Sequence, residues 1–228
     1  MPEPKRVILS WSSGKDSAWT LHTLHRQNVE VVALLTTFNE AFDRVAMHGT
    51  RRALVEAQAE AAGIPLFPVF LPWPCSNADY EKIMGAALAQ MKAQFQPTHV
   101  AFGDLFLEDI RAYRETQMAN TGLELLFPIW QQPTDELARQ MTAAGLQAVI
   151  TCVDPKQMPA SFAGRRFDRE LLDELPASVD PCGENGEFHS FVFSGPMFSK
   201  AIAIDIGETV ERDGFVFTDV DFAPEHSA

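Results

Sequence analysis

Short apolar runs alternate with helical patterns through residues 1–150, and this alternation constrains the fold more than any other feature of the chain. Strands that are separated by helices pair in parallel, because each crossover returns the chain to the same end of the sheet. We therefore expect a doubly wound parallel α/β sheet. The expected strands cover residues 6–11, 29–38, 64–72, 98–104, 123–130 and 146–154, and the expected helices cover residues 15–27, 49–63, 77–95, 109–122 and 134–145.

The pattern changes after residue 150. Prolines and a polar stretch come first, and the run AIAIDIGETV then alternates apolar and polar residues, which is typical of an antiparallel strand. The Asp213–Gly214 pair before FVFTDV is a signal for a tight turn between two strands. We predict a first domain at residues 1–150 and a smaller α+β region at residues 151–228.

The charge balance disfavours nucleic acid as a partner. The chain has 228 residues, of which 31 are acidic and 18 are basic, so its formal net charge is -13. The summed field of such a chain repels polyanions. Hydrophobic residues make up 46% of the chain and charged residues 21%, which is the usage of a globular protein with a sizeable core.

The cysteines and the apolar runs indicate a reduced, aqueous compartment. Cys75, Cys152 and Cys182 are far apart and form no C-x-x-C pair, which disfavours both a zinc ribbon and a disulfide framework. No apolar run approaches about 18 residues, and the apolar stretch near the N-terminus is too short for a signal peptide. We therefore expect a cytoplasmic protein that does not enter a membrane.

The run ILSWSSGKDSAW at residues 8–19 has a Ser- and Gly-rich turn between a strand and a helix. Backbone N–H groups converge on a phosphate in this geometry, and the helix N-terminus adds positive potential. Lys15 and the serine hydroxyls are further donors, while Gly14 permits close approach of the backbone. Asp16 separates the lysine from Ser17, and no second glycine lies five residues upstream, so the run differs from the Walker A loop of a kinase or GTPase. Asp16 suits a role in holding Mg²⁺ on the phosphates or in capping the helix.

A second group of polar residues follows the fourth expected strand. Gly103 and Asp104 fall at its carboxyl end, the same edge as the Ser- and Gly-rich turn, where open α/β sheets bind ligands. Arg111, Arg114 and Glu115 lie three and four residues apart, so they share one face of the next helix. The group indicates either a substrate site or a solvated charged face.

A third group lies in DPCGENGEFHSFV, residues 180–192. This run has Cys182, Glu184, Glu187 and His189 on a Gly-rich loop ahead of an apolar strand, and such loops commonly carry functional residues. One thiol, one imidazole and two carboxylates do not specify a metal site. The group is therefore a candidate for catalysis, or an ordinary polar loop.

Together the three groups resemble one family. SSGKDS is similar to the S-G-G-x-D-S loop of the PP-loop ATP pyrophosphatases, with Ser13 in place of the first glycine. GDLFLEDIRAYRE and CGENGEF resemble two further motifs of the diphthine ammonia ligase (diphthamide synthetase)-like PP-loop ATPases, and the resemblance extends over nearly the whole chain. His48, in AMHGT, fits the family's position for a polar residue that faces the cleft. The resemblance implies the adenine nucleotide α-hydrolase fold.

The resemblance also implies ATP-dependent ligase chemistry with Mg²⁺. Members of the family cleave ATP to AMP and pyrophosphate, form an adenylate on a carboxyl group, and convert it to an amide with ammonia. The implied ATP-binding residues are Ser10, Ser12, Ser13, Gly14, Lys15, Asp16, Ser17, Gly103 and Asp104, of which Asp16 and Asp104 are also the implied magnesium ligands. The implied substrate-binding residues are His48, Arg111, Arg114 and Glu115, and the implied catalytic residues are Lys15, Asp16, Glu184, Glu187 and His189.

The acceptor and the oligomeric state stay open. The family's acceptor is a modified histidine on translation elongation factor 2, for which this chain has no obvious docking domain, and the ENGEFHSFV form also resembles a branch that acts on a small metabolite. The nitrogen donor is ammonia or an amine, and a homodimer is compatible with the sequence. A non-catalytic nucleotide-binding protein is disfavoured by the retained Asp16. An RNA-thiolating PP-loop enzyme is disfavoured by the acidic charge and the missing C-x-x-C pair.

Overall fold

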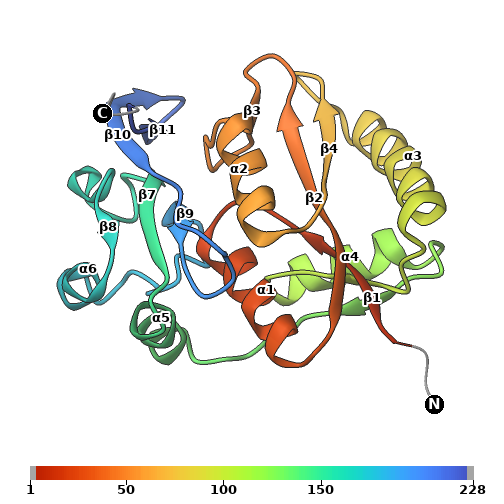
Figure 1. Ribbon diagram of the computed structural model, residues 1–228. Coiled ribbons are helices and arrows are strands. Elements are labelled where there is room, and N and C mark those ends of the chain that lie inside the picture. Colours follow the sequence, from red (N-terminus) through yellow and green to blue (C-terminus); the bar gives the residue numbers. More distant parts are fainter. Residues whose placement is uncertain (1–3, 225–228) are drawn as a thin grey trace.

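The computed structural model describes residues 4–224, and a parallel sheet forms their N-terminal half (Figure 1). Its strands are β1 (Arg6–Ser10), β2 (Glu30–Asn39), β4 (Leu66–Leu71), β5 (His99–Ala101) and β6 (Glu124–Leu126). Neighbours follow the order β4-β2-β1-β5-β6, and every pair along this path is parallel. A short strand, β3 (Arg44–Val45), pairs antiparallel with the end of β2. The predicted parallel α/β sheet is confirmed.

Helices cover both faces of this sheet. α1 (Lys15–Arg26) and α2 (Arg52–Ala62) pack on one face, where Leu21 and Val55 join Val7 in one apolar cluster. α3 (Asn77–Phe95) and α4 (Glu108–Met118) pack on the other face, where Met91 joins Ile8. Val7 and Ile8 are adjacent in β1 and so point to opposite faces. The sheet is therefore doubly wound, as predicted.

The C-terminal half forms a second sheet, which is antiparallel. β7 (Gln147–Val153) lies at its centre and pairs with β8 (Arg166–Phe167), β9 (Phe188–Ser194) and β11 (Phe215–Phe222), while β10 (Ile204–Arg212) pairs with β11. The other elements of this half are α5 (Thr134–Ala143), the 3₁₀ turn η1 (Ala160–Phe162) and α6 (Arg169–Glu174). Asp213 and Gly214 join β10 to β11 with φ values of 53° and 83°, which confirms the predicted tight turn.

The position of β7 corrects one expectation. A last parallel strand at residues 146–154 is wrong, because every strand that pairs with β7 runs antiparallel to it. A central strand that is buried on both faces reads as a continuous apolar run in either kind of sheet, so the run alone does not distinguish them. The predicted boundary near residue 150 falls inside β7, and the division into two domains stays a prediction.

The two halves share a core and a hydrogen-bonded junction. Ile150 and Val192 of the second sheet lie in the same apolar cluster as the buried face of α1. Gln58, fully buried on α2, donates to the carbonyl oxygens of Ser13 at 3.0 Å and of Val192 at 2.6 Å. Its amide oxygen accepts a hydrogen bond from Trp11 Nε1 at 2.8 Å. One buried amide thus joins α2, the loop after β1, and β9.

We predict that Gln58→Leu lowers the free energy of unfolding by about 2–4 kcal/mol, because it leaves the buried N–H of Trp11 and the carbonyl of Val192 without this partner. Urea denaturation followed by circular dichroism measures the change. Gln90→Leu, at an exposed position of α3, is the matched control. Equal destabilisation by the two substitutions would contradict the role of Gln58.

Candidate active site

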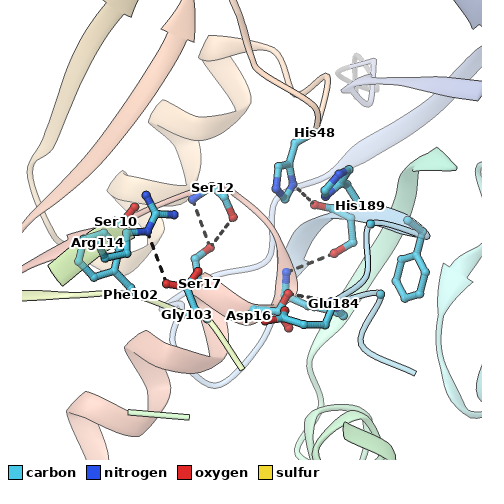
Figure 2. A pocket seen from close by; sticks show the side chains of 16 residues that line it. Ser10, Ser12, Asp16, Ser17, His48, Phe102, Gly103, Arg114, Glu184 and His189 are labelled. Carbon is cyan, nitrogen blue, oxygen red and sulfur yellow. Dashed lines mark hydrogen bonds and ion pairs between the residues drawn. The ribbon is translucent and has the colours of Figure 1, made fainter. Parts of the chain in front are cut away.

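A cavity of about 290 Å³ lies at the carboxyl ends of β1 and β5 (Figure 2). Strand order reverses between these two strands, and open α/β sheets bind ligands at this point. The cavity is lined by Ser10, Ser12, Lys15, Asp16, Ser17, His48, Phe102, Gly103, Asp104, Arg114, Gly183, Glu184, Gly186, Phe188, His189 and Ser190. Most of the predicted site residues are among them, whereas Ser13, Gly14, Arg111, Glu115 and Glu187 lie outside this lining.

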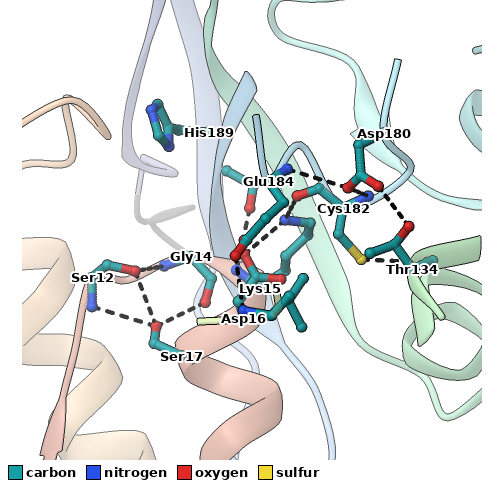
Figure 3. Close-up of polar contacts among 12 residues, drawn as sticks. Ser12, Gly14, Lys15, Asp16, Ser17, Thr134, Asp180, Cys182, Glu184 and His189 are labelled. Carbon is teal, nitrogen blue, oxygen red and sulfur yellow. Dashed lines mark hydrogen bonds and ion pairs between the residues drawn. The ribbon is translucent and has the colours of Figure 1, made fainter. Parts of the chain in front are cut away.

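The loop between β1 and α1 folds around its own polar groups (Figure 3). Ser13 has a φ of 72°, the left-handed conformation that favours glycine. Its hydroxyl lies 2.8 Å from Thr50 Oγ1, and its side chain is fully buried. The backbone explains why a related loop has glycine here, and the hydroxyl contact explains how serine is accommodated. Ser17 Oγ donates to the carbonyl of Gly14 at 3.0 Å and accepts from Ser12 Oγ at 3.2 Å.

Two glycines allow close approach around this loop. A Cβ on Gly14 would lie 2.7 Å from His48 Cε1 and 3.1 Å from the carbonyl oxygen of Ser190. A Cβ on Gly103 would lie 3.0 Å from the carbonyl carbon of Asp16. A side chain at either position would push the walls of the cavity apart.

Lys15 reaches across to the C-terminal loop. Its Nζ donates to Asp16 Oδ2 at 2.8 Å and to the carbonyl oxygen of Cys182, and it lies 5.1 Å from the ring centroid of Phe188. Burial is the largest single influence and opposes the charged form, but Asp16, Cys182 and Glu184 together outweigh it and raise the pKa of Lys15. The buried ammonium therefore stays charged and ties the C-terminal loop to the start of α1.

Asp16 and Asp104 each have a buried carboxylate oxygen without a hydrogen-bond partner among the described residues. Within residues 4–224, Asp16 Oδ1 and Asp104 Oδ2 are buried and accept no hydrogen bond. Arg114 Nε lies 3.5 Å from Asp104 Oδ2, beyond a normal hydrogen bond, and is likewise buried without a hydrogen-bond partner among the described residues. Burial raises the pKa of Asp104, and Arg114 offsets part of that effect.

The carboxylates of Asp16 and Asp104 suit a magnesium ion. In the described part of the chain, no group of three or more His, Cys, Asp or Glu residues is arranged to hold a metal. Mg²⁺ is commonly bound through one or two carboxylates, with water and substrate phosphates as its other ligands. The carboxylates of Asp16 and Asp104, each with one oxygen that accepts no hydrogen bond within residues 4–224, fit that donor set.

Only one of the two predicted arginines, Arg111 and Arg114, lines the cavity. Arg114 lines it, with its guanidinium 4.7 Å from the ring centroid of Phe102. Arg111 instead lies over Phe127 at 4.7 Å and bonds Glu115 through Nε at 2.9 Å. The i, i+4 pair of Arg111 and Glu115 is the solvated helix contact that the sequence left as an alternative, and Arg114 alone can meet a ligand in the cavity.

The loop at residues 180–187 is held by two carboxylates of its own. Asp180 Oδ1 accepts from the N–H groups of Cys182 and Glu184 at 2.9 and 3.2 Å. Glu187 is 2% exposed, and its carboxylate accepts from the N–H of Asp180 and of Asn185, both at 2.9 Å. The predicted catalytic position of Glu187 thus lies inside the loop, away from the cavity.

The thiol of Cys182 is also turned inward. Its Sγ donates to the carbonyl oxygen of Thr134 at 3.4 Å, and burial raises its pKa well above the ordinary value. A thiol in this state is a poor nucleophile. The backbone carbonyl of Cys182, which accepts from Lys15, is the part of the residue that the site uses.

Glu184 projects from this loop into the cavity and meets the loop after β5. Its Oε1 accepts from Leu105 N at 2.8 Å. Burial raises the pKa of Glu184 to about 7, although the hydrogen bond from Leu105 opposes the shift. The carboxyl therefore exchanges a proton near neutral pH and closes one side of the cavity.

His48 and His189 stand together on the cavity wall, with ring centroids 4.7 Å apart (Figure 2). The carbonyl oxygen of Ser190 lies 3.1 Å from His48 Nδ1. Because a carbonyl only accepts, Nδ1 carries the proton and Nε2 keeps its lone pair. Burial lowers the pKa of His48 to about 4 and that of His189 well below its ordinary value, so both rings are neutral at pH 7.

Four residues of the site were not predicted from the sequence. They are Asp180, Ser190, Phe102 and Phe188. Asp180 precedes a proline, and this turn signal could have indicated its role in the loop. Ser190 Oγ accepts from Lys15 N at 3.2 Å, across 175 positions of sequence, and no local pattern reports such a contact. Phe102 and Phe188 read as ordinary apolar residues of strands.

Residues 5–124 match the model of the diphthamide synthase N-terminal domain, and residues 133–221 match that of the diphthamide synthase C-terminal domain. The chain belongs to the diphthamide synthase family. Relatives named diphthine–ammonia ligase include one from Danio rerio, 27% identical over 95% of this chain and 93% of the relative. One from Homo sapiens is 24% identical over 94% of this chain and 88% of the relative.

A solved structure described as a predicted subunit of tRNA methyltransferase from Methanocaldococcus jannaschii covers 87% of this chain and 100% of its own. It has a TM-score of 0.44 and 16% identity, a likeness too weak to argue from.

Membership of the diphthamide synthase family confirms the predicted resemblance and makes the chain an enzyme of an ATP-using ligase family. Residues 4–224 contain no helix of the length and hydropathy that a membrane span requires.

We predict that Glu184→Gln removes a pH dependence of stability between about pH 4.5 and 7. The carboxyl has a folded pKa of about 7 and an ordinary pKa of 4.5, so the unfolded chain loses the proton first and the wild type loses stability as pH rises through this window. After allowance for partial exposure, the expected change relative to the variant is about 1–2 kcal/mol. Urea denaturation at several pH values measures it, with the surface substitution Glu56→Gln as control. Parallel curves for wild type and Glu184→Gln would contradict the assignment.

Proposed function

We propose that this diphthamide synthase family member activates a carboxylate with ATP and converts it to an amide. The observation that carries the proposal is a pair of buried carboxylate oxygens, Asp16 Oδ1 and Asp104 Oδ2, beside the N-terminus of α1 within one cavity. Neither has a hydrogen-bond partner among the described residues, and Asp104 Oδ2 faces Arg114 at 3.5 Å. A helix N-terminus favours phosphate, and free carboxylate oxygens next to it favour a metal ion that accompanies phosphate.

A second cavity supports a nucleotide rather than a lone phosphate. It also measures about 290 Å³ and is lined by Leu35 and Thr37 of β2 and by Met84 and Leu88 of α3. An apolar cavity of this kind suits the adenine base and ribose. The residues that line both cavities are Ser10, Ser12, His48, Phe102 and Arg114. In the proposal, the base occupies the second cavity and the phosphates reach the start of α1.

Asp16 and Asp104 are the residues that would hold Mg²⁺. When bound, the ion would offset the negative charge of the phosphates. The backbone N–H groups at the start of α1 and the hydroxyls of Ser12 and Ser17 would donate to the same phosphates. Of the residues first assigned to ATP, Ser13 and Gly14 contribute through the shape of the loop.

The proposed reaction has two bond exchanges. First, an oxygen of the acceptor carboxylate attacks the α-phosphorus, the bond between that phosphorus and the oxygen bridging to the β-phosphate breaks, and pyrophosphate leaves. Second, the nitrogen of ammonia attacks the acyl carbon, the bond from that carbon to the AMP oxygen breaks, and the nitrogen loses a proton. Arg114 is the cation available to hold the acceptor carboxylate beside the phosphates.

The C-terminal loop supplies the proposed proton acceptor. Glu184 lines the cavity, and its pKa of about 7 lets it take a proton from the nitrogen at neutral pH. The neutral rings of His48 and His189 are proposed to position ammonia by accepting its N–H groups, because His48 Nε2 keeps a lone pair. Lys15 and Glu187 act through the loop in this proposal, since one ties it to α1 and the other holds its backbone.

We predict that Asp16→Asn and Asp104→Asn each reduce ATP turnover about 100-fold or more, because each removes a carboxylate oxygen from the phosphate site. Asp173→Asn, at an exposed ion pair on α6, is expected to keep wild-type turnover. The measurement is separation of labelled nucleotide products during turnover with ammonia and a panel of carboxylate acceptors that includes diphthine-bearing elongation factor 2. AMP and pyrophosphate are the expected products.

Two results of this experiment would count against the proposal. ADP and phosphate as products would mean that the loop transfers or releases the γ-phosphate instead. Nucleotide binding without turnover on any acceptor would favour a non-catalytic binding protein. The acceptor that supports turnover, a modified protein or a small metabolite, assigns the substrate class.

A further inference from the structure

A third hollow, of about 460 Å³, lies between the two halves of the molecule outside the catalytic cavity. One wall consists of Phe42 and Met47 from the β2–β3 region together with Trp73 from the segment after β4. The other wall is one face of the β10–β11 hairpin, with the cross-strand pair Val210 and Phe217 at its centre. We call this hollow the hairpin groove.

The hairpin groove is lined by large apolar side chains that meet solvent. The exposed fractions of Trp73, Phe42 and Met47 are 64%, 52% and 48%. Each wall has a pair of aromatic rings. The ring centroids of Phe42 and Trp73 are 6.3 Å apart on one wall, and those of Phe215 and Phe217 are 6.4 Å apart on the other. A gathered apolar surface of this kind marks a binding site far more often than a scattered residue does.

Charged residues at the base of the groove hold its two walls together. Arg44 Nη1 lies 2.8 Å from Asp219 Oδ1 and donates to the carbonyl of Gly49 at 2.7 Å. Arg51 Nη2 lies 2.5 Å from Asp219 Oδ2. These contacts join β11 to β3 and to the residue before α2, so the groove is formed before any ligand arrives.

The groove and the catalytic cavity lie on either side of one tight turn. His48 N donates to the carbonyl of Ala46 at 2.7 Å, and Met47 between them has a φ of 60°. Met47 and Gly49 line the groove, whereas His48 lines the catalytic cavity. A Cβ on Gly49 would lie 3.3 Å from the ring of Phe217, so the turn passes close over the hairpin. Val45 and Ala46 line both the groove and the cavity assigned to the base, so a molecule in the groove lies one turn away from His48 and the proposed site of acyl transfer.

We infer that the hairpin groove binds the apolar, ring-bearing body of a small carboxylate acceptor, whose carboxyl group extends past His48 toward Arg114 in the catalytic cavity. The volume suits this occupant, because sites for small molecules span roughly 300–1,000 Å³ and are lined mainly by apolar and aromatic side chains with a few polar groups. Aromatic rings on both walls favour a flat ring system between them. The inference rests on the proposed function, since it names the acceptor class of that reaction.

A second copy of the chain is a poorer occupant. The groove lining has charges of both signs, Glu208 and Asp213 beside Arg44 and Arg212, and Asp219 is already paired with Arg44 and Arg51, so the lining offers no charge pattern that a second copy would complement. The net charge of -13 on each copy adds repulsion between them. A small ligand with its charge at the end that enters the catalytic cavity avoids this repulsion.

The groove is tested with 8-anilinonaphthalene-1-sulfonate, a fluorescent probe with aromatic rings and one anionic group. We expect the intact protein to bind the probe, and we expect Phe42→Ser and Trp73→Ser to weaken binding roughly tenfold each. Ile206→Ser is the matched control, because Ile206 is a 40% exposed apolar residue of β10 outside the groove. Equal probe affinity in all variants would overturn the inference. A Trp73-dependent dimer in sedimentation would overturn it in favour of a second copy.

The acceptor role is tested by acid-dependent pyrophosphate release on a panel that pairs ring-bearing acids with small polar acids such as glutamate. Ring-bearing acids are expected to displace the probe and to support turnover, and Trp73→Ser is expected to raise the KM for the acid and leave the KM for ATP unchanged. Turnover on an acid that does not displace the probe would overturn the acceptor role alone. Absence of pyrophosphate with every acid and also with diphthine-bearing elongation factor 2 would overturn the proposed ligase reaction and with it the acceptor role, whereas release with elongation factor 2 alone would overturn only the acceptor role.

Discussion

The rest of the site depends on the hydrogen bonds that join Ser13 to the second sheet. The carbonyl oxygen of Ser13 accepts from Val192 N at 3.0 Å and from the buried amide of Gln58 at 3.0 Å. These bonds fix the loop before α1 against β9, a strand that follows it by more than half the chain. Without them the start of α1 would face solvent, because the C-terminal loop forms the opposite wall of the cavity. The left-handed backbone of Ser13 turns this carbonyl toward β9.

Electrostatics then decide what this enclosed loop can bind. The chain is strongly acidic, and Asp16, Asp104 and Glu184 all line the cavity, so a polyphosphate meets negative charge there. Three features reduce that charge. The ammonium of Lys15 pairs with Asp16, Arg114 lies near Asp104, and the raised pKa of Glu184 leaves this carboxyl partly protonated near neutral pH. Among the described residues Asp16 Oδ1 still has no partner, which favours a divalent cation as the remaining compensation.

Local signals in the sequence predicted the fold and placed the loop between β1 and α1 at the sheet edge, whereas the long-range contacts were not predicted. The strand–turn–helix pattern at residues 8–19 is contiguous, so its position at the sheet edge follows from the parallel topology. The sheet to which β7 belongs depends on partner strands that are distant in sequence. The apolar run of β7 does not indicate whether those partners pair with it in parallel or antiparallel. Lys15 and Glu187 were predicted by type, but the contacts that turn them toward the loop at residues 180–187 come from the tertiary structure. Arg111 and Arg114 lie on the same helix, yet they pack on different aromatic rings, Phe127 and Phe102.

A reaction through an acyl adenylate requires that water be kept from the intermediate until the nitrogen arrives. The contacts of Glu184 serve that need, because its carboxyl bridges the C-terminal loop to Leu105 and closes the cavity on the side of β5. The opposite side is bounded by His48, whose ring is held by the carbonyl of Ser190 and flanked by His189. The turn that carries His48 also forms a wall of the hairpin groove. If the groove binds the acceptor as inferred, the molecule that brings the carboxylate would cover this turn beside the proposed adenylate, which would couple substrate choice to protection of the intermediate.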